Sequence, residues 1–153
     1  MAIYVYNRAI ESHQQHPNNY PIFRGGGVLG NPYTHKKLEK TKAIYQVKSR
    51  DEAISCYERY FDVMYQSNIK FKAVVDEIYE KYKNGEDIFL ECYCKKYQSN
   101  DTFEHLDEVR CHGDIIKERL ERRLLRERFR ELRKNDRDRI QTKCRDIGTS
   151  SSD

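Results

Sequence analysis

Two linked features constrain the fold of this chain most. A strand-like run ends in two cysteines, and a cysteine and a histidine follow later, at a predicted helix start. The run from Asp87 to Cys94 is almost continuously apolar, as expected of a sheet strand covered on both sides. Its period of two puts Cys92 and Cys94 on one face. After a polar segment at 95–110, Cys111-His112-Gly113-Asp114 directly precedes a long periodic segment, which predicts that a helix begins there. Open backbone N–H groups at such a start favour an anion.

Length and composition limit the fold and exclude several classes of protein. With 153 residues, 35% of them charged, the chain fits one compact domain and has no apolar run long enough to cross a membrane. The start lacks the layout of a signal peptide, and five cysteines, an odd number, do not fit a disulfide framework. We therefore expect reduced thiols in a cytoplasm and no membrane partner, whereas the oligomeric state stays open.

The basic excess belongs to the C-terminal part of the chain. Residues 1–113 carry 16 basic and 16 acidic side chains, whereas residues 114–145 carry 13 basic and 7 acidic ones. The pattern predicts a helix from Ile115 to about Arg137, with its arginines in one sector. This arginine stripe is a solvated face or a contact for nucleic acid or a partner protein. It consists of Arg119, Arg122, Arg123, Arg126, Arg130, Arg133 and Arg137.

A glycine-rich stretch is the second candidate for binding. Gly25, Gly26 and Gly27 follow Arg24, and exposed N–H groups beside a guanidinium suit an oxyanion. A flexible turn is the alternative, because the stretch matches no phosphate-binding motif. Asn31, before a proline, is expected to bind a base or a ribose hydroxyl.

The remaining elements follow from periodicity and capping signals. Residues 3–6 are expected to form the first and central strand, 7–19 a loop and 43–47 a short strand. Ser49 and Glu52 form a capping box that opens a helix, so Asp51 and Glu52 are assigned to capping. A second helix with an apolar face from Phe71 to Tyr82 ends at Asn84-Gly85. Tyrosines on these faces are expected to pack in the core.

Several of these motifs, in this order, resemble a family known as domain of unknown function 4326, which occurs in phages and bacteria. They are Phe23-Arg24-Gly25, Leu29 to Tyr33, Ser49 to Ile54, Leu90 to Cys94 and Cys111 to Ile116. The resemblance covers roughly residues 3–125 and implies a compact Rossmann-like α/β domain that is phage-encoded, but no activity. Family members tend to have fewer residues than 95–110 between the cysteine strand and the Cys-His-Gly turn, and the arginine-rich extension departs from the family pattern as well.

Three interpretations of the cysteine-histidine cluster remain open. Cys92, Cys94, Cys111 and His112 form a valid zinc set. Against it, Cys92 and Cys94 lie about 7 Å apart along a strand, so a shared ion requires a bend or bulge. A nucleophilic Cys111 or Cys94, with its thiol pKa lowered by the helix start and His112, is the second interpretation. The third, which we favour, is a ligand pocket walled by cysteines, without a metal or cofactor.

The favoured fold is therefore a small Rossmann-like α/β domain with a parallel sheet at residues 1–125, followed by a long charged helix and tail at 126–153. Arg24, residues 25–27 and Asn31 are expected to converge with Cys94 and Gly113 at the carboxyl ends of parallel strands, where such sheets bind ligands. His112 and Cys111 are the catalytic candidates. We expect a nucleotide or nucleoside-derived ligand and a glycosidic-bond or base-modifying activity. The alternative is a phage protein without enzymatic activity that binds nucleic acid or a host partner through the arginine stripe.

Overall fold

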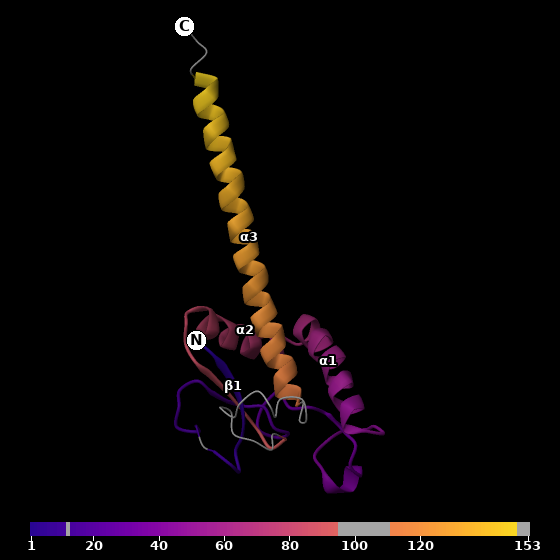
Figure 1. Cartoon of the computed structure of the whole chain (residues 1–153). Coiled ribbons are helices and arrows are strands. Elements are labelled where there is room, and N and C mark those ends of the chain that lie inside the picture. Colours follow the sequence, from indigo (N-terminus) through magenta and orange to yellow (C-terminus); the bar gives the residue numbers. More distant parts are fainter. Residues whose placement is uncertain (12, 95–110, 150–153) are drawn as a thin grey trace. The chain divides into compact units, whose positions relative to one another are not determined.

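The computed structural model describes residues 1–11, 13–94 and 111–149 (Figure 1). The polar segment at 95–110 and residues 150–153 of the C-terminal tail lie outside the described residues. The chain divides into two compact units, Met1–Glu118 and Arg119–Asp153. The sequence placed this boundary after residue 125, within the same helix. In the part of the chain that the structure describes, no helix combines the length and apolar character needed to cross a membrane.

A three-stranded parallel sheet forms the centre of the first unit. It consists of β1 (Ile3–Asn7), β5 (Ile88–Cys92) and β2 (Asn19–Pro21), in the order β1-β5-β2. The small parallel α/β fold is confirmed, but the prediction that the first strand is central was wrong, because β5 pairs with a strand on each side. The loop expected at 7–19 ends in β2. The sequence did not predict this strand, because it has only three residues and one of them is a proline.

Two shorter strands form a separate parallel pair. They are β3 (Tyr33–Thr34) and β4 (Tyr45–Gln46), and β4 lies within the short strand expected at 43–47. Between them, the 3-10 helix η1 (Leu38–Lys40) forms part of a basic loop. The rings of Tyr33 and Tyr45 stack with their centroids 5.1 Å apart, which ties the two strands together.

Two amphipathic helices connect β4 to β5. In α1 (Arg50–Ser67) the predicted capping by Ser49 and Glu52 is confirmed: Ser49 Oγ accepts from Glu52 N at 3.1 Å, and Glu52 Oε2 reaches back to accept from Lys48 N, one residue before the N-cap, at 2.9 Å. Asn68 ends α1 and caps α2 (Ile69–Lys83), its Oδ1 accepting from Phe71 N. After α2, Gly85 has a φ of +91°, the left-handed conformation expected of the predicted stop.

The core of the first unit is built from the inner faces of these elements. The tyrosines of α1 and α2 pack as predicted, with Tyr57, Tyr79 and Tyr82 buried. Helix α1 packs on α2 and β3, and α2 packs on β5. Burial of about 25 cal/mol per Å² of apolar surface makes this packing the main stabilising term.

Helix α3 (His112–Thr149) is longer than the sequence predicted at both ends. It starts at His112. There Asp114 Oδ2 accepts a hydrogen bond from Cys111 N at 2.8 Å, and this bond satisfies a backbone N–H that has no partner within the helix. It continues past Arg137, where residues 138–147 contain neither glycine nor proline to end it. The helical and charged character of this segment is confirmed.

Candidate functional site

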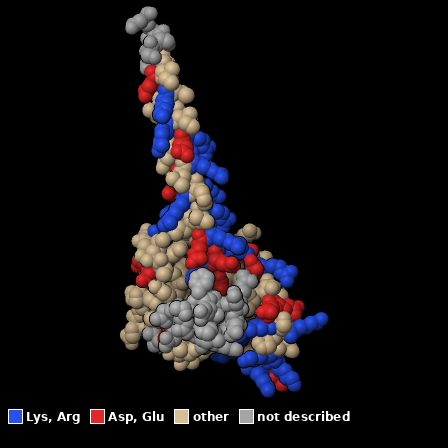
Figure 2. Space-filling model, in the orientation of Figure 1, with Lys and Arg blue, Asp and Glu red and all other residues tan. Residues whose placement is uncertain are grey.

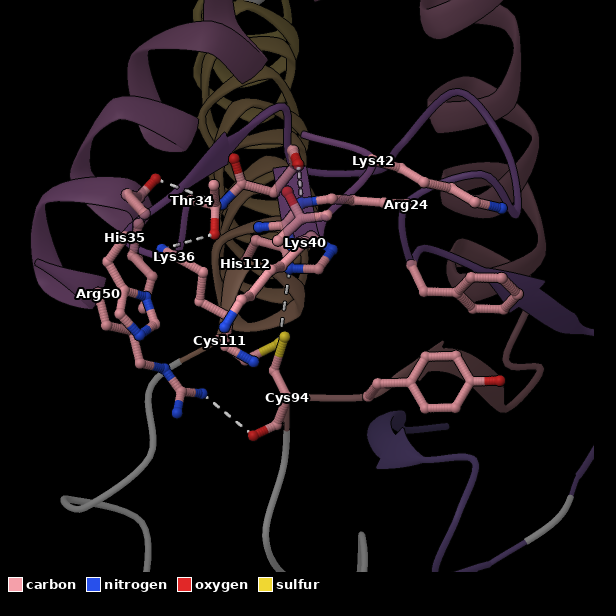
Figure 3. Close-up of a pocket in the computed structure, with 16 residues that line it drawn as sticks. Arg24, Thr34, His35, Lys36, Lys40, Lys42, Arg50, Cys94, Cys111 and His112 are labelled. Carbon is pink, nitrogen blue, oxygen red and sulfur yellow. Dashed lines mark hydrogen bonds between the residues drawn. The ribbon is translucent and has the colours of Figure 1, made fainter. Parts of the chain in front are cut away.

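A cavity of about 560 Å³ lies where β2 and β5 end and α1 and α3 begin (Figure 3). Phe23 and Arg24 reach it just after β2, and Tyr93 and Cys94 just after β5. Arg50 contributes from the start of α1, and Cys111 and His112 from the start of α3. The carboxyl ends of two neighbouring parallel strands therefore face one cavity, as expected of ligand sites in open α/β sheets.

The cavity wall is strongly basic. Among the described residues that line it, none is acidic, and five are lysine or arginine. They are Arg24, Lys36, Lys40, Lys42 and Arg50, and the histidines His35 and His112 line it as well. Of these lysines and arginines, the sequence analysis named only Arg24, although the run from His35 to Lys42 was a signal: it holds four lysines and a histidine in eight residues. A loop with this charge, folded over a cavity, favours an anionic ligand.

Arg24 is held by the protein's own backbone. Its Nε donates to the carbonyl of Asn31 and its Nη2 to the carbonyl of Tyr33, both at 2.6 Å. Burial lowers the pKa of this guanidinium, while the charge of Cys94 acts in the opposite direction. Asn31 is similarly engaged, since its Oδ1 accepts from Tyr33 N and its Nδ2 donates to Ala53 O. Both residues line the cavity, yet these bonds fold the loop around it.

The glycines proposed for binding pack tightly against the protein itself. None of Gly25, Gly26, Gly27 and Gly113 is among the described residues that line the cavity. A Cβ on Gly26 would lie 2.6 Å from the ring of Phe23. A Cβ on Gly113 would lie 2.6 Å from Val5 Cγ1 and 2.8 Å from Ile22 Cδ1. Gly113 therefore lets the first turn of α3 approach the strands closely.

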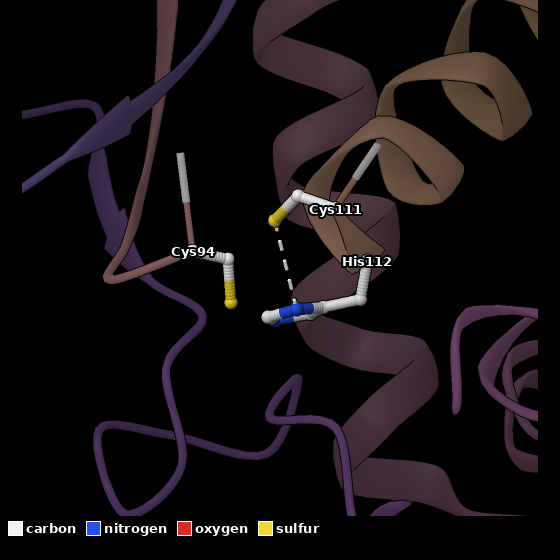
Figure 4. Close-up of side chains that lie close together, drawn as sticks. All are labelled: Cys94, Cys111 and His112. Carbon is white, nitrogen blue, oxygen red and sulfur yellow. Dashed lines mark hydrogen bonds between the residues drawn. The ribbon is translucent and has the colours of Figure 1, made fainter. Parts of the chain in front are cut away.

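Two cysteines and a histidine meet at the cavity wall (Figure 4). The thiols of Cys94 and Cys111 and a ring nitrogen of His112 all lie within 4.8 Å of one another. The predicted strand to Cys94 was too long: β5 ends at Cys92, and the chain bends at Tyr93. Cys92 and Cys94 therefore do not follow one extended strand, and the thiol of Cys92 contacts that of Cys94.

The pKa values of the Cys94 and Cys111 thiols shift in opposite directions. Contacts with the thiols of Cys111 and Cys92 lower the pKa of Cys94 far below its usual range, although burial acts to raise it. Contact with Cys92 acts to lower the pKa of Cys111, but the charge of Cys94 and burial raise it overall. Cys111 is also only 1% exposed. Burial and a raised pKa do not favour Cys111 as a nucleophile, whereas the lowered pKa of the exposed Cys94 favours its thiolate form.

His112 is buried and fixed in orientation. Its Nε2 lies 2.6 Å from the carbonyl oxygen of Ile22, so this nitrogen donates its proton. Its Nδ1 then holds the lone pair of the neutral ring and faces Cys111 Sγ at 3.7 Å. Tyr57 packs edge-on against the ring, with centroids 5.1 Å apart. The protein therefore presents Nδ1, an acceptor or metal ligand, toward the thiols.

A buried carboxylate network that the sequence analysis missed lies in the sheet. Glu91 is 3% exposed; its Oε2 accepts from Asn19 Nδ2 at 2.7 Å and lies 3.2 Å from the hydroxyl of Tyr6. Tyr6 also hydrogen-bonds to Asn19 Oδ1, and burial followed by the charge of Glu91 raises its pKa. Arg8 Nε lies 3.2 Å from Glu91 Oε1 as an ion pair. The one signal was a glutamate inside an apolar strand pattern.

The second unit carries the arginine stripe (Figure 2). Five of its seven arginines are exposed, and Arg119 and Arg123 are half-buried. Arg123 pairs with Glu127 at 3.9 Å, and Arg137 Nε donates to the carbonyl of Arg133. Exposed apolar side chains, Leu125, Phe129, Leu132, Ile140 and Ile147, accompany the stripe along the helix.

Comparison with known proteins gives one match. The model of the family described as "Domain of unknown function (DUF4326)" matches residues 6–122, which include the end of β1, β2 to β5, the cavity and the first turns of α3. No curated protein and no solved structure matches the chain significantly.

Proposed function

This chain belongs to the DUF4326 family, whose description names no activity, so we propose a function from the chain's own cavity. The proposed function is the binding of a nucleotide or nucleoside-derived anion. The observation that supports this most is the set of five lysine and arginine side chains around a cavity of about 560 Å³, with no acidic residue among the described residues that line it. This volume lies within the roughly 300–1,000 Å³ typical of small-molecule sites. Lysines and arginines recognise phosphate by charge and hydrogen bonding.

Two aromatic residues favour a base beside the phosphate. Phe23 and Tyr93 line the cavity and contact each other edge to face, with centroids 5.1 Å apart. Aromatic surface next to a cationic wall suits a ligand with one flat apolar part and one anionic part. We place this binding in the cytoplasm of a host cell, as expected for a phage-encoded family member.

Removing single cavity lysines should weaken nucleotide binding. Isothermal titration calorimetry with a panel of nucleotides, NAD and cyclic signalling nucleotides should identify a ligand of the wild type. The affinity for this ligand should fall about threefold to fivefold in Lys36→Gln and in Lys42→Gln, because an exposed ionic contact contributes up to about 1 kcal/mol. The affinity should also fall with salt. Arg24→Ala is a poor probe, because it also releases the loop carbonyls that Arg24 holds.

Lys37→Gln is the matched control, because Lys37 is exposed, adjoins Lys36 and is not among the cavity-lining residues. Equal losses in Lys36→Gln and Lys37→Gln, or no binding of any nucleotide by the wild type, would contradict the proposal. Chromatography of the same nucleotides after incubation distinguishes binding alone from glycosidic-bond cleavage or base modification.

A second candidate function is contact with nucleic acid or a host protein through the arginine stripe, favoured by the five exposed arginines on one sector of α3.

In full-length protein, Arg130→Gln with Arg133→Gln should weaken binding to DNA or RNA and reduce the slope of log K against log salt by roughly 2, one for each lost phosphate contact. Fluorescence anisotropy over a salt series measures this slope. The control, Arg128→Gln with Arg139→Gln, removes two exposed arginines outside the stripe. An identical effect of both pairs would show that only net charge matters.

A further inference from the structure

We propose that Cys94, Cys111 and His112 bind one zinc ion at the cavity wall, with the fourth coordination position open to the cavity. Their three ligand atoms lie within 4.8 Å of one another although 16 residues separate Cys94 from Cys111 in the chain. Two thiolates and one imidazole are a ligand set that suits zinc, and three protein ligands with an open position are typical of reactive zinc sites.

The spacing of the ligand atoms fits a tetrahedral ion. Zinc bonds of about 2.3 Å to sulfur and about 2.0–2.1 Å to nitrogen place a bound sulfur and nitrogen about 3.5 Å apart, and two sulfurs about 3.8 Å apart. Cys111 Sγ and His112 Nδ1 are 3.7 Å apart. Figure 4 shows both sulfurs beside the imidazole, so an ion placed among the three requires only small side-chain adjustments.

The surrounding contacts orient each buried ligand. The hydrogen bond from His112 Nε2 to the carbonyl of Ile22 leaves Nδ1 as the coordinating nitrogen, the arrangement usual for metal-bound histidines. Cys111 Sγ accepts from the backbone N–H of Gly113 at 3.3 Å. This amide, in the first turn of α3, stabilises a negative sulfur.

The position of the ligands in the wall indicates an open site. Cys94, Cys111 and His112 all line the cavity, whereas Cys92, buried at the end of β5, contacts the other two thiols but neither lines the cavity nor belongs to the set of ligand atoms that lie within 4.8 Å of one another. The fourth position therefore faces the cavity, where water or an anion can occupy it. The zinc proposal rests on the ligand geometry alone and holds whether or not the cavity binds a nucleotide.

Elemental analysis of the full chain, purified without a metal-affinity tag, should find about one zinc per protein. Cys94→Ser, at the surface, should fold and lose most of this zinc, and Cys111→Ser should lose it as well. Cys56→Ser and Cys144→Ser, which alter cysteines outside the cluster, should retain it. Circular dichroism of each variant checks that the fold persists.

Cobalt provides a readout that does not depend on variants. Wild-type protein stripped by a chelator and titrated with Co²⁺ should show thiolate charge-transfer absorption and a tetrahedral d–d spectrum that saturates at one equivalent. Removal of zinc should also lower the Tm by roughly 5 °C or more, and added zinc should restore it, because metal binding is coupled to folding.

Cys92→Ala should retain the metal and its cobalt spectrum, because we assign no coordination to Cys92. Loss of metal in this folded variant would overturn the open site in favour of a closed site with four ligands. Wild-type protein with less than about a tenth of an equivalent of zinc, and without thiolate absorption on cobalt addition, would overturn the metal site. Nucleotide titration of metal-stripped protein tests the proposed binding function separately.

Discussion

Gly113→Ala should destabilise the protein by about 2 kcal/mol, because its Cβ would lie 2.6 Å from Val5 Cγ1 and 2.8 Å from Ile22 Cδ1. Overpacking of this kind costs about 1–3 kcal/mol, and the better helix propensity of alanine offsets up to about 1 kcal/mol of it. Val5 is β-branched and buried, so it cannot rotate away easily. Urea unfolding followed by circular dichroism measures the loss as a lower midpoint.

Gly148 supplies the matched control for this substitution. It lies near the end of α3, and a Cβ there meets nothing within 4 Å. Gly148→Ala should therefore leave stability unchanged or raise it by up to about 1 kcal/mol. Val5→Ala removes the nearer obstacle, so the double variant with Gly113→Ala should be more stable than the sum of the two single effects predicts. Strict additivity would show that the contact with Val5 does not limit this position.

Glu91→Ala should destabilise the protein by about 3 kcal/mol. The variant removes the acceptor of Asn19 Nδ2 and the partner of Arg8, and it leaves the Tyr6 hydroxyl with one partner fewer. Breaking a buried, charged network costs about 3–5 kcal/mol, and the partial exposure of Arg8 reduces this figure. Thermal and urea unfolding should both show the loss.

An exposed glutamate provides the comparison for Glu91. Glu77 pairs with Lys81 at 3.7 Å on the surface of α2, and Glu77→Ala should change stability by no more than about 0.5 kcal/mol. Glu91→Gln keeps the shape and part of the hydrogen bonding, so its loss should lie between those of the other two variants. Similar values for Glu91→Ala and Glu77→Ala would mean that the network contributes little.

Local signals in the sequence were sufficient to predict much of the fold. The capping by Ser49 and Glu52, the stop at Gly85 and the apolar faces of α1 and α2 depend on neighbouring residues, and each was predicted correctly. The convergence of Arg24, Asn31, Cys94, Cys111 and His112 on one cavity also followed from one rule, that parallel strands carry ligand sites at their carboxyl ends.

Features that depend on tertiary contacts were missed or misplaced. Strand β2 exists because β5 offers it an edge, and three residues with a proline carry no such signal. Lys36, Lys40 and Lys42 come to line the cavity only because their loop folds over it, which no periodicity encodes. Arg24 was interpreted as a clamp for a ligand, yet two backbone carbonyls already accept its hydrogen bonds. The bend at Tyr93, which brings Cys94 toward Cys111, is likewise set by packing.

The closeness of Cys94 and Cys111 has a consequence for how related chains can diverge. Both ends of the 16-residue interval between them are anchored, one by the strand that precedes Cys94 and the other by the helix that follows Cys111. The entropic cost of joining two fixed points by a longer stretch of chain rises by only about 0.6 kcal/mol for each doubling of its length. Related chains can therefore differ in the number of residues between these two cysteines at little thermodynamic cost. The strand and the helix, which fix the cavity wall, need not change with that number.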